Sequence, residues 1–275
     1  MNITTQTDFY KVGHIFQYPE GTEYIYSNLT ARSADKFKHF PNTFDKKVVF
    51  FGLQAFIQKY LVEAWSDFFE GAKSWAINHY SRRMKNSIGP IDVSHFVELH
   101  DLGYLPILIK ALPEGSRVNI GVPMFTIINT DPRFFWLTNY LETMISAEIW
   151  KTCTSATIAY QYRKLFDSYA IKTGTPKEFV QWQGHDFSMR GMDGIDSAAR
   201  SGAAHLLSFS GTDTIPAIDF LEEFYMADSD KELIGASVPA TEHSVMSTWI
   251  IDVETALRDT GEWNGYRVED FKHFS

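Results

Sequence analysis

The stretch FVQWQGHDFSMRGMDGIDSAARSGAAHLLSFSGTDT, residues 179–214, alternates short apolar runs with polar loops. Its pattern predicts a helix near residues 196–206, and a further helix is predicted near 215–225. Each apolar run that precedes a polar loop is typical of a strand. The same succession returns in GASVPATEHS, residues 235–244, which leads into another predicted helix. This repetition predicts an α/β fold with parallel strands that begin a sheet or barrel.

The residues before this stretch predict a mixture of helices and strands. Strands are expected at 23–30, 105–111 and 122–130, the last two adjacent, and helices at 51–65, 67–83, 132–151 and 155–172. Asp131 followed by Pro132 is a helix start signal, and Gly174 marks the end of the long helical region. We therefore expect a mixed α+β domain over residues 1–150 and the first part of an α/β barrel over 151–275.

Composition excludes several classes of protein. The 34 acidic and 25 basic residues give a net charge of −9, which disfavours a nucleic-acid or anionic-membrane partner. Hydrophobic residues make up 44% of the chain, enough for a sizeable core. The single cysteine, Cys153, excludes an internal disulfide and a cysteine-based zinc site. The start MNITTQTDFYKVGH has no signal-peptide pattern, so a cytoplasmic location is expected.

The candidate functional residues are polar groups at the ends of predicted strands. The chain contains no Walker A loop, GxGxxG turn, GxSxG elbow or HExxH helix. Active sites of (β/α) barrels lie at the carboxyl ends of the strands. Three groups occupy such positions here: His185–Asp186–Phe187 with Arg190, Gly211–Thr212–Asp213–Thr214, and Ser237–Val238–Pro239–Ala240 followed by Glu242–His243–Ser244.

Each of these residues also has a purely structural interpretation. Asp213 would cap the helix that follows it, and Phe187 would join the core. Arg190 would form a surface ion pair with a nearby aspartate. His243 would be a surface histidine within a capping arrangement at a helix start.

Seven segments, in this order and with nearly this spacing, resemble successive blocks of the nicotinamide phosphoribosyltransferases: TDFYKVGHIFQYPEGT (7–22), VVFFGLQAFIQKYL (48–61), LPILIKALPEG (105–115), NTDPRFFWLTNYLET (129–143), HDFSMRG (185–191), HLLSFSGTDT (205–214) and SVPATEHSV (237–245). The resemblance extends from about residue 6 to about residue 250. That family transfers a phosphoribosyl group from phosphoribosyl pyrophosphate to nicotinamide, giving nicotinamide mononucleotide and pyrophosphate in NAD biosynthesis. It implies a type II phosphoribosyltransferase barrel, incomplete at the carboxyl terminus, after the α+β domain.

The resemblance also implies how nicotinamide is held. The flat pyridine would stack between Phe187 and Tyr10 of a neighbouring subunit, so a homodimer with shared sites is expected. Asp213 would accept a hydrogen bond from the carboxamide and repel nicotinic acid. Arg190 would lie beside the ring and reach phosphate. Arg32 would reach phosphate across the dimer, and the pocket wall would include Asp8, Ser237, Val238 and Ala240.

Two cofactor roles follow from the same resemblance. ATP would phosphorylate His243, whose neutral imidazole is a competent nucleophile. Mg²⁺ would be bound to substrate oxygens rather than to a protein metal site. Asp213 and His243 are therefore the predicted catalytic residues.

The family's chains are longer than this one. The later loops that grip ribose and pyrophosphate in that family have no counterpart before Ser275. Three alternatives therefore stand beside the nicotinamide enzyme: a nicotinate phosphoribosyltransferase, a truncated non-catalytic binding or assembly module, and one piece of a divided enzyme completed by a second chain.

Overall fold

The computed structural model describes residues 2–34 and 44–271. The chain forms two compact units, Met1–Ala236 and Ser237–Ser275. The division expected near residue 150 stays a prediction. Trp150 lies within one continuous helix.

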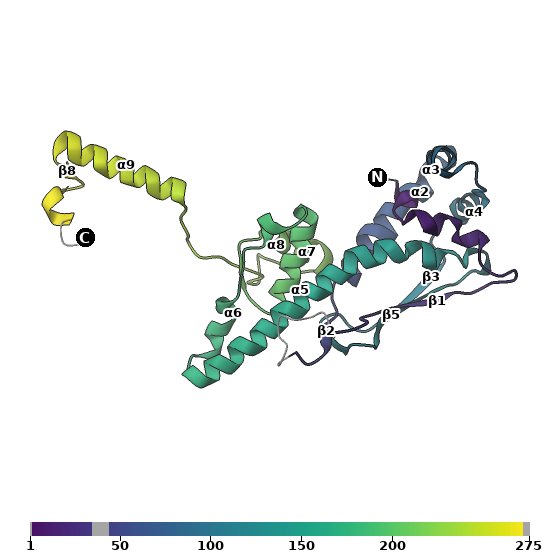
Figure 1. The fold of residues 1–275 in the computed structure, drawn as a ribbon, viewed down its shortest axis with the longest axis horizontal. Coiled ribbons are helices and arrows are strands. Elements are labelled where there is room, and N and C mark those ends of the chain that lie inside the picture. Colours follow the sequence, from purple (N-terminus) through teal and green to yellow (C-terminus); the bar gives the residue numbers. More distant parts are fainter. Residues whose placement is uncertain (1, 35–43, 272–275) are drawn as a thin grey trace. The chain divides into compact units, whose positions relative to one another are not determined.

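That helix, α5 (Leu137–Thr173), is the axis of the first unit (Figure 1). It joins the two expected helical segments without a break. A 3₁₀ turn, η4 (Pro132–Phe134), precedes it, and the Asp131 carboxylate accepts a hydrogen bond from the Arg133 N–H at 3.0 Å. Gly174 ends the helix with a φ of 72°, which glycine adopts at little cost. Both helix boundary signals are confirmed.

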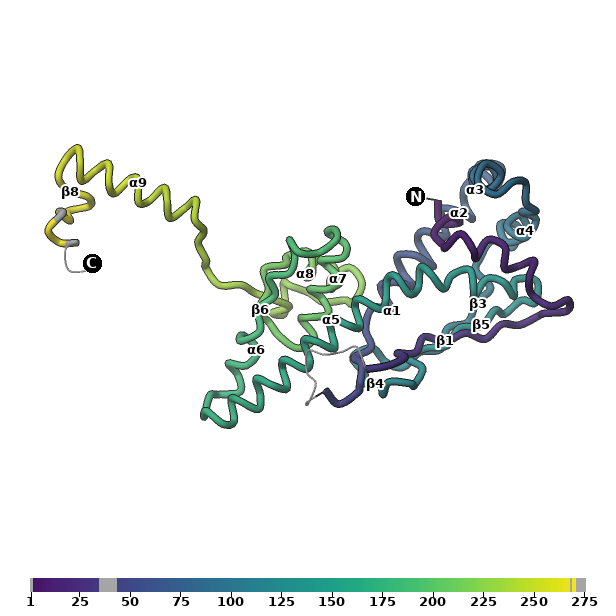
Figure 2. The backbone as a smooth tube through the Cα atoms, viewed as in Figure 1, coloured from purple at the N-terminus to yellow at the C-terminus, as the bar shows by residue number. Residues whose placement is uncertain are grey.

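An antiparallel sheet in the order β1-β5-β3 packs against the first half of α5 (Figure 2). Its strands are β1 (Tyr26–Thr30), β3 (Ile107–Ala111) and β5 (Pro123–Asn129). The predicted adjacency of the second and third strands is confirmed, with Ile109 opposite Ile127. A smaller antiparallel pair joins β2 (Lys47–Val49) to β4 (Arg117–Asn119).

The helices of the first half enclose one aromatic-rich core with this sheet. Trp65, Phe96, Phe134 and Leu137 are almost wholly buried in it. The helix expected at 51–65 is α1 continued by a π-helix, and the helix expected at 67–83 is interrupted near Gly71. The elements are η1 (Ile3–Thr5), η2 (Phe9–Phe16), α1 (Leu53–Phe56), the π-helix η3 (Ile57–Ala64), α2 (Trp65–Glu70), α3 (Lys73–Ile88) and α4 (Ser94–Leu102).

The second half of α5 packs against the start of a parallel α/β arrangement. The expected helices near 196–206 and 215–225 are confirmed as α7 and α8. Strands β6 and β7 pair in parallel, and a parallel bridge joins Gly211 to Ala236. The elements are η5 (Lys177–Phe179), α6 (Val180–Gln183), β6 (His185–Asp186), η6 (Met189–Gly191), α7 (Ile195–Leu206), β7 (Gly211–Thr212) and α8 (Pro216–Tyr225).

The second unit contains the expected helix after the EHS loop. It consists of α9 (His243–Thr260), β8 (Glu262–Trp263), β9 (Tyr266–Arg267) and η7 (Val268–Phe271). Along α9 the large apolar side chains Val245, Met246, Trp249, Ile250 and Ile251 are exposed. Within the described ranges, every helix is too short or too polar to cross a bilayer.

Candidate functional site

The predicted ring-binding residues directly follow two paired strands. His185 lies opposite Gly211 and Asp186 opposite Thr212 in the parallel register of β6 and β7. Phe187 and Asp213 are the next residues along the two strands, so they emerge at the same edge. The register therefore brings the HDF and GTDT motifs together at the carboxyl ends of two neighbouring strands, as the sequence predicted.

His185 contacts both predicted residues. Its Nε2 lies 2.7 Å from the Asp213 Oδ1, and its ring centroid lies 4.4 Å from that of Phe187 at an interplanar angle of 31°. Sequence reasoning placed His185 in the motif but gave it no role. The sequence did carry a signal for this contact. His185 lies two residues before Phe187, and Asp213 follows the neighbouring predicted strand.

The two structural interpretations of Phe187 and Asp213 are not supported. The Phe187 side chain is 65% exposed and does not belong to the core. Helix α8 has Ile215 as its N-cap residue and no side-chain cap, so Asp213 does not cap it. Both side chains are consequently placed where a ligand can reach them.

An open groove of about 490 Å³ adjoins this strand edge. Its apolar wall is formed by side chains of the second half of α5 and by aromatic rings that precede and follow α7 in the sequence. The lining residues include Ile158, Tyr162, Phe166, Phe187 and Phe209, with His185, Asp186, Ser188 and His205 as polar members. A flat, weakly polar ligand suits such a wall.

The amino-terminal candidates lie at a different stretch of α5. The Thr143 hydroxyl donates to the Asp8 carboxylate at 2.7 Å, while the groove beside Phe187 begins on α5 at Ser155. The twelve-position separation along the helix corresponds to a rise of about 18 Å. Tyr10 is 60% exposed and lies in η2, beside Asp8. Within one chain, therefore, the segment that carries Tyr10 contacts a different part of α5 from the part that lines the groove beside Phe187.

The two candidate arginines are exposed and lie in different places. Arg32 follows β1 and lines a groove of about 480 Å³ between that strand and α5. Arg190 lies in η6, directly after the Phe187 loop. The nearby Asp193 accepts a hydrogen bond from Lys151 at 2.5 Å, so this aspartate is held by α5.

The remaining candidates belong to the second unit. Ser237, Val238, Ala240 and His243 are all exposed. His243 is the first residue of α9, and its neighbour Glu242 is the N-cap residue without a side-chain cap. The Ser244 hydroxyl donates to the Glu242 carboxylate instead. The capping interpretation of the Glu242 side chain is therefore not supported.

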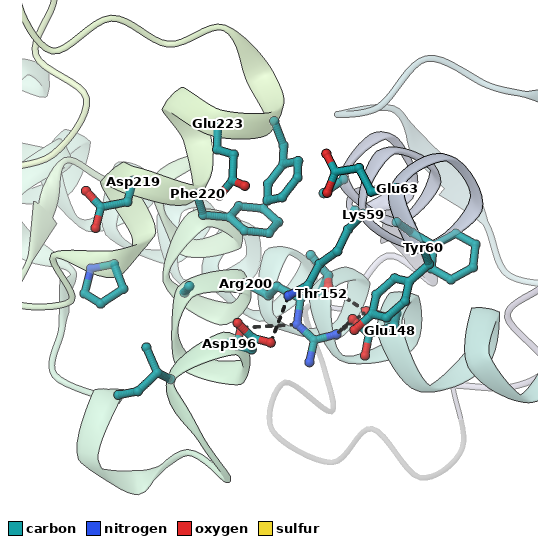
Figure 3. A pocket seen from close by; sticks show the side chains of 17 residues that line it. Lys59, Tyr60, Glu63, Glu148, Thr152, Asp196, Arg200, Asp219, Phe220 and Glu223 are labelled. Atoms are coloured by element: carbon teal, nitrogen blue, oxygen red, sulfur yellow. Dashed lines mark hydrogen bonds and ion pairs between the residues drawn. The ribbon is translucent and has the colours of Figure 1, made fainter. Parts of the chain in front are cut away.

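A separate pocket of about 240 Å³ lies between η3, α5, α7 and α8 (Figure 3). Lys59 pairs with Asp196 at 2.8 Å, and Arg200 pairs with Glu148. Burial, with the nearby Glu148 carboxylate, raises the pKa of Tyr60 to about 12. The predicted site residues do not line this pocket. The two ion pairs thus link α7 to η3 and to α5.

Metal binding by the protein alone is not indicated by the described residues. Across 2–34 and 44–271 there is no group of three or more His, Cys, Asp or Glu side chains placed to hold a metal ion.

Comparison with known proteins identifies the class. Residues 2–109 match the model of the nicotinamide phosphoribosyltransferase N-terminal domain, and residues 182–272 match that of the nicotinate phosphoribosyltransferase family. The fold resembles the crystal structure of human nicotinic acid phosphoribosyltransferase with a TM-score of 0.54 and 15% identity, covering 88% of this chain and 40% of that one. The fold is therefore that of part of a type II phosphoribosyltransferase.

Two similar proteins within this class are nicotinamide phosphoribosyltransferases. The chain is 55% identical to a nicotinamide phosphoribosyltransferase of Acinetobacter baylyi over 90% of its own length and 48% of the relative's. It is 31% identical to one of Xanthomonas campestris pv. campestris, over 90% of its own length and 49% of that protein. The chain is thus similar to nicotinamide phosphoribosyltransferases over 90% of its own length, and it spans about half the length of these relatives.

Proposed function

We propose that this chain supplies the nicotinamide-binding part of a nicotinamide phosphoribosyltransferase that forms nicotinamide mononucleotide in NAD biosynthesis. One observation carries the proposal: at the carboxyl ends of β6 and β7, the exposed Phe187 ring and the Asp213 carboxylate both contact His185. The match of residues 2–109 to the nicotinamide phosphoribosyltransferase N-terminal domain and the 55% identity to the Acinetobacter baylyi protein support the same assignment.

The chemistry of this edge suits an uncharged pyridine carboxamide. The open ring of Phe187 offers a stacking surface, and the Asp213 carboxylate accepts hydrogen bonds from an amide NH₂ group. A nicotinate carboxylate would instead face the like charge of Asp213. This difference favours the nicotinamide enzyme over a nicotinate phosphoribosyltransferase.

The second ring surface would come from another copy of the chain. Tyr10 is exposed, and its neighbour Asp8 binds Thr143 of α5, well away from the groove beside Phe187 of the same chain. A homodimer in which each Tyr10 covers the partner's Phe187 site satisfies both facts. In such a dimer Asp8 and Arg32 would also approach the partner's site, Arg32 towards phosphate.

The remaining groups would complete substrate binding. Arg190, exposed in η6 after the Phe187 loop, would bind phosphate oxygens. Ser237, Val238 and Ala240 would contribute to the pocket wall. Because the glycosyl transfer develops charge on the ribose and on the departing pyrophosphate, positioning and electrostatics would dominate catalysis.

ATP would phosphorylate His243 in this proposal. The imidazole is exposed at the first position of α9, where the positive end of the helix dipole favours an added phosphoryl group. Mg²⁺ would enter with the pyrophosphate oxygens of the substrate, where it neutralises their charge. A cytoplasmic location stays a prediction.

Turnover would require polypeptide beyond these residues. The chain covers 48% of its Acinetobacter relative, and the apolar side chains of α9 are exposed. Apolar surface of this kind is stabilised when another segment covers it. Such a segment could belong to a longer chain or to a second polypeptide of a divided enzyme. A non-catalytic binding module is the alternative that lacks turnover altogether.

Isothermal titration of the chain with nicotinamide and with nicotinate tests the proposal. We expect saturable binding of nicotinamide and much weaker binding of nicotinate. Equal affinity for the two ligands, or no binding of nicotinamide by a folded dimer, would reject the assignment.

A further inference from the structure

Asp186, the last residue of β6, carries a carboxylate that the sequence analysis left without a function. The residue is only 7% exposed. Its side chain lies on the opposite side of β6 from His185 and Phe187, because side chains alternate along a strand. Asp186 also lines the groove beside Phe187, but both of its carboxylate oxygens accept hydrogen bonds from within the protein.

Each oxygen of this carboxylate accepts hydrogen bonds from a different loop of the site: one loop follows β6 and contains Ser188, and the other follows β7 and contains Thr214. Oδ1 accepts hydrogen bonds from the Ser188 amide at 2.9 Å and the Ser188 hydroxyl at 2.6 Å. Oδ2 accepts from the hydroxyls of Thr214 at 2.7 Å and Thr212 at 3.4 Å. Phe187 lies between Asp186 and Ser188 in the chain, and Asp213 lies between Thr212 and Thr214. The two oxygens thus bind the immediate neighbours of both predicted ligand-binding residues.

Backbone contacts reinforce the same connection. The Asp213 amide donates to the Asp186 carbonyl at 2.9 Å, and the Thr214 amide donates to the Thr212 hydroxyl at 3.0 Å. Helix α7 leaves space for the carboxylate at Gly202, where an added Cβ would lie 3.1 Å from Asp186 Oδ2 and 2.7 Å from Ala217 Cβ. The position of the Asp186 carboxylate therefore depends on the close packing of α7 against α8 at Gly202.

The charge of Asp186 is retained in this setting. Burial raises its pKa, but the hydrogen bonds from Ser188 and Thr214 outweigh burial, so the pKa lies below its usual value. Hydrogen bonds to an ionised carboxylate are stronger than those between neutral groups. The loops are thus held by bonds of the stronger kind.

We propose that Asp186 is a positioning residue that links the two loops and fixes the spacing between the Phe187 ring and the Asp213 carboxylate. It acts through Ser188 and Thr214 and does not itself touch nicotinamide. This inference rests on the proposed function, because the geometry it fixes is that of the nicotinamide site. It assigns part of the specificity of this site to a buried carboxylate whose oxygens are bound within the protein.

The test compares Thr214→Val with Thr214→Ser in the full chain. Valine has the shape of threonine but cannot donate to Asp186 Oδ2, whereas serine retains the hydroxyl. We expect the valine variant to bind nicotinamide about tenfold more weakly and the serine variant to bind within about twofold of the original protein. Hydrogen exchange should rise in the valine variant at Ser188, which lies on the other loop, as well as at residues 212–214.

The reciprocal variant Ser188→Ala keeps the test informative if the valine variant does not fold. This variant should raise hydrogen exchange at residues 212–214, on the loop that Ser188 reaches through Asp186. Exchange in β1, β3 and β5 should stay unchanged in both variants, since a general loss of stability would raise it there too.

Three results would overturn the proposal: equal affinities of the valine and serine variants, increased exchange confined to the altered loop, or increased exchange throughout the first unit. If the unaltered chain binds no nicotinamide, the proposed function fails. The exchange at Ser188 in the two Thr214 variants would then still decide whether Asp186 links the loops.

Discussion

The Nε2 of His185 lies 2.7 Å from the Oδ1 of Asp213, across two parallel strands that pair residue 185 with residue 211. This bond holds the carboxylate that would recognise an amide and the imidazole that contacts the Phe187 ring. The ring surface and the amide acceptor are therefore parts of one hydrogen-bonded and stacked group. Substitutions in this group should change ligand selectivity more than overall stability.

Asp213→Ala should weaken nicotinamide binding by about 1 to 3 kcal/mol, because the carboxamide loses its acceptor. Nicotinate binding should not weaken and is expected to strengthen, since the same substitution removes a repulsive charge. Calorimetry with both ligands measures the two effects. Asp219→Ala, an exposed carboxylate on α8, is the matched control and should leave both affinities unchanged. Equal losses for the two ligands would disprove the role of Asp213.

His185→Ala should weaken nicotinamide binding several-fold, because the Asp213 carboxylate loses a partner and the Phe187 ring loses a contact. His185→Gln, whose amide N–H can still reach a carboxylate, should recover part of that loss. Titration of the two variants with nicotinamide measures the difference. An alanine variant with unchanged affinity would show that His185 does not orient the site.

His243→Ala should abolish labelling of the chain by γ-phosphate-labelled ATP, since no other group would replace the proposed acceptor. The neighbouring Ser244→Ala should retain the label, which separates a phosphohistidine from a phosphoserine. Acid lability of the label gives a second check, because phosphohistidine hydrolyses in acid. Persistent labelling of the alanine variant at that position would exclude His243.

Stability should fall between pH 7 and pH 5 because of His95. Burial lowers the pKa of this histidine to about 4, and its Nδ1 has no hydrogen-bond partner. The unfolded chain, with an ordinary histidine pKa near 6.5, then binds more protons than the folded chain over this range. His95 alone should account for about 2 kcal/mol of lost unfolding free energy.

Urea unfolding at the two pH values checks this effect. The variant His95→Phe should reduce the difference between pH 7 and pH 5 by that amount. Phenylalanine suits the site, since His95 packs against Phe96 and Trp136. An unchanged difference in the variant would show that another group controls the acid response.

Local sequence signals predicted the elements of this fold well. Asp131 and Gly174 mark the start and end of the long helical region, because a cap and a left-handed backbone depend on only a few neighbouring residues. The βα repetition predicted α7, α8 and the parallel pairing of β6 with β7. The interruption at Gly71 was not predicted, since the apolar spacing continues through it.

Contacts between distant segments were harder to predict. The bond from His185 to Asp213 and the bonds from Asp186 to Thr212 and Thr214 span 26 to 28 residues. They depend on strand register, which motif recognition alone does not give. The ion pairs of Figure 3, such as Lys59 with Asp196, likewise join helices far apart in the chain.

The most direct test of the shared nicotinamide site mixes two defective variants, Tyr10→Ala and Phe187→Ala. Each should bind nicotinamide weakly alone, because each homodimer lacks one ring surface. After the two are mixed and allowed to exchange subunits, heterodimers carry one site with both rings and one with neither. We predict that titration of the mixture recovers original affinity at about a quarter of all sites, as random pairing requires. Failure of the mixture to exceed the separate variants, once exchange is verified, would contradict the shared site.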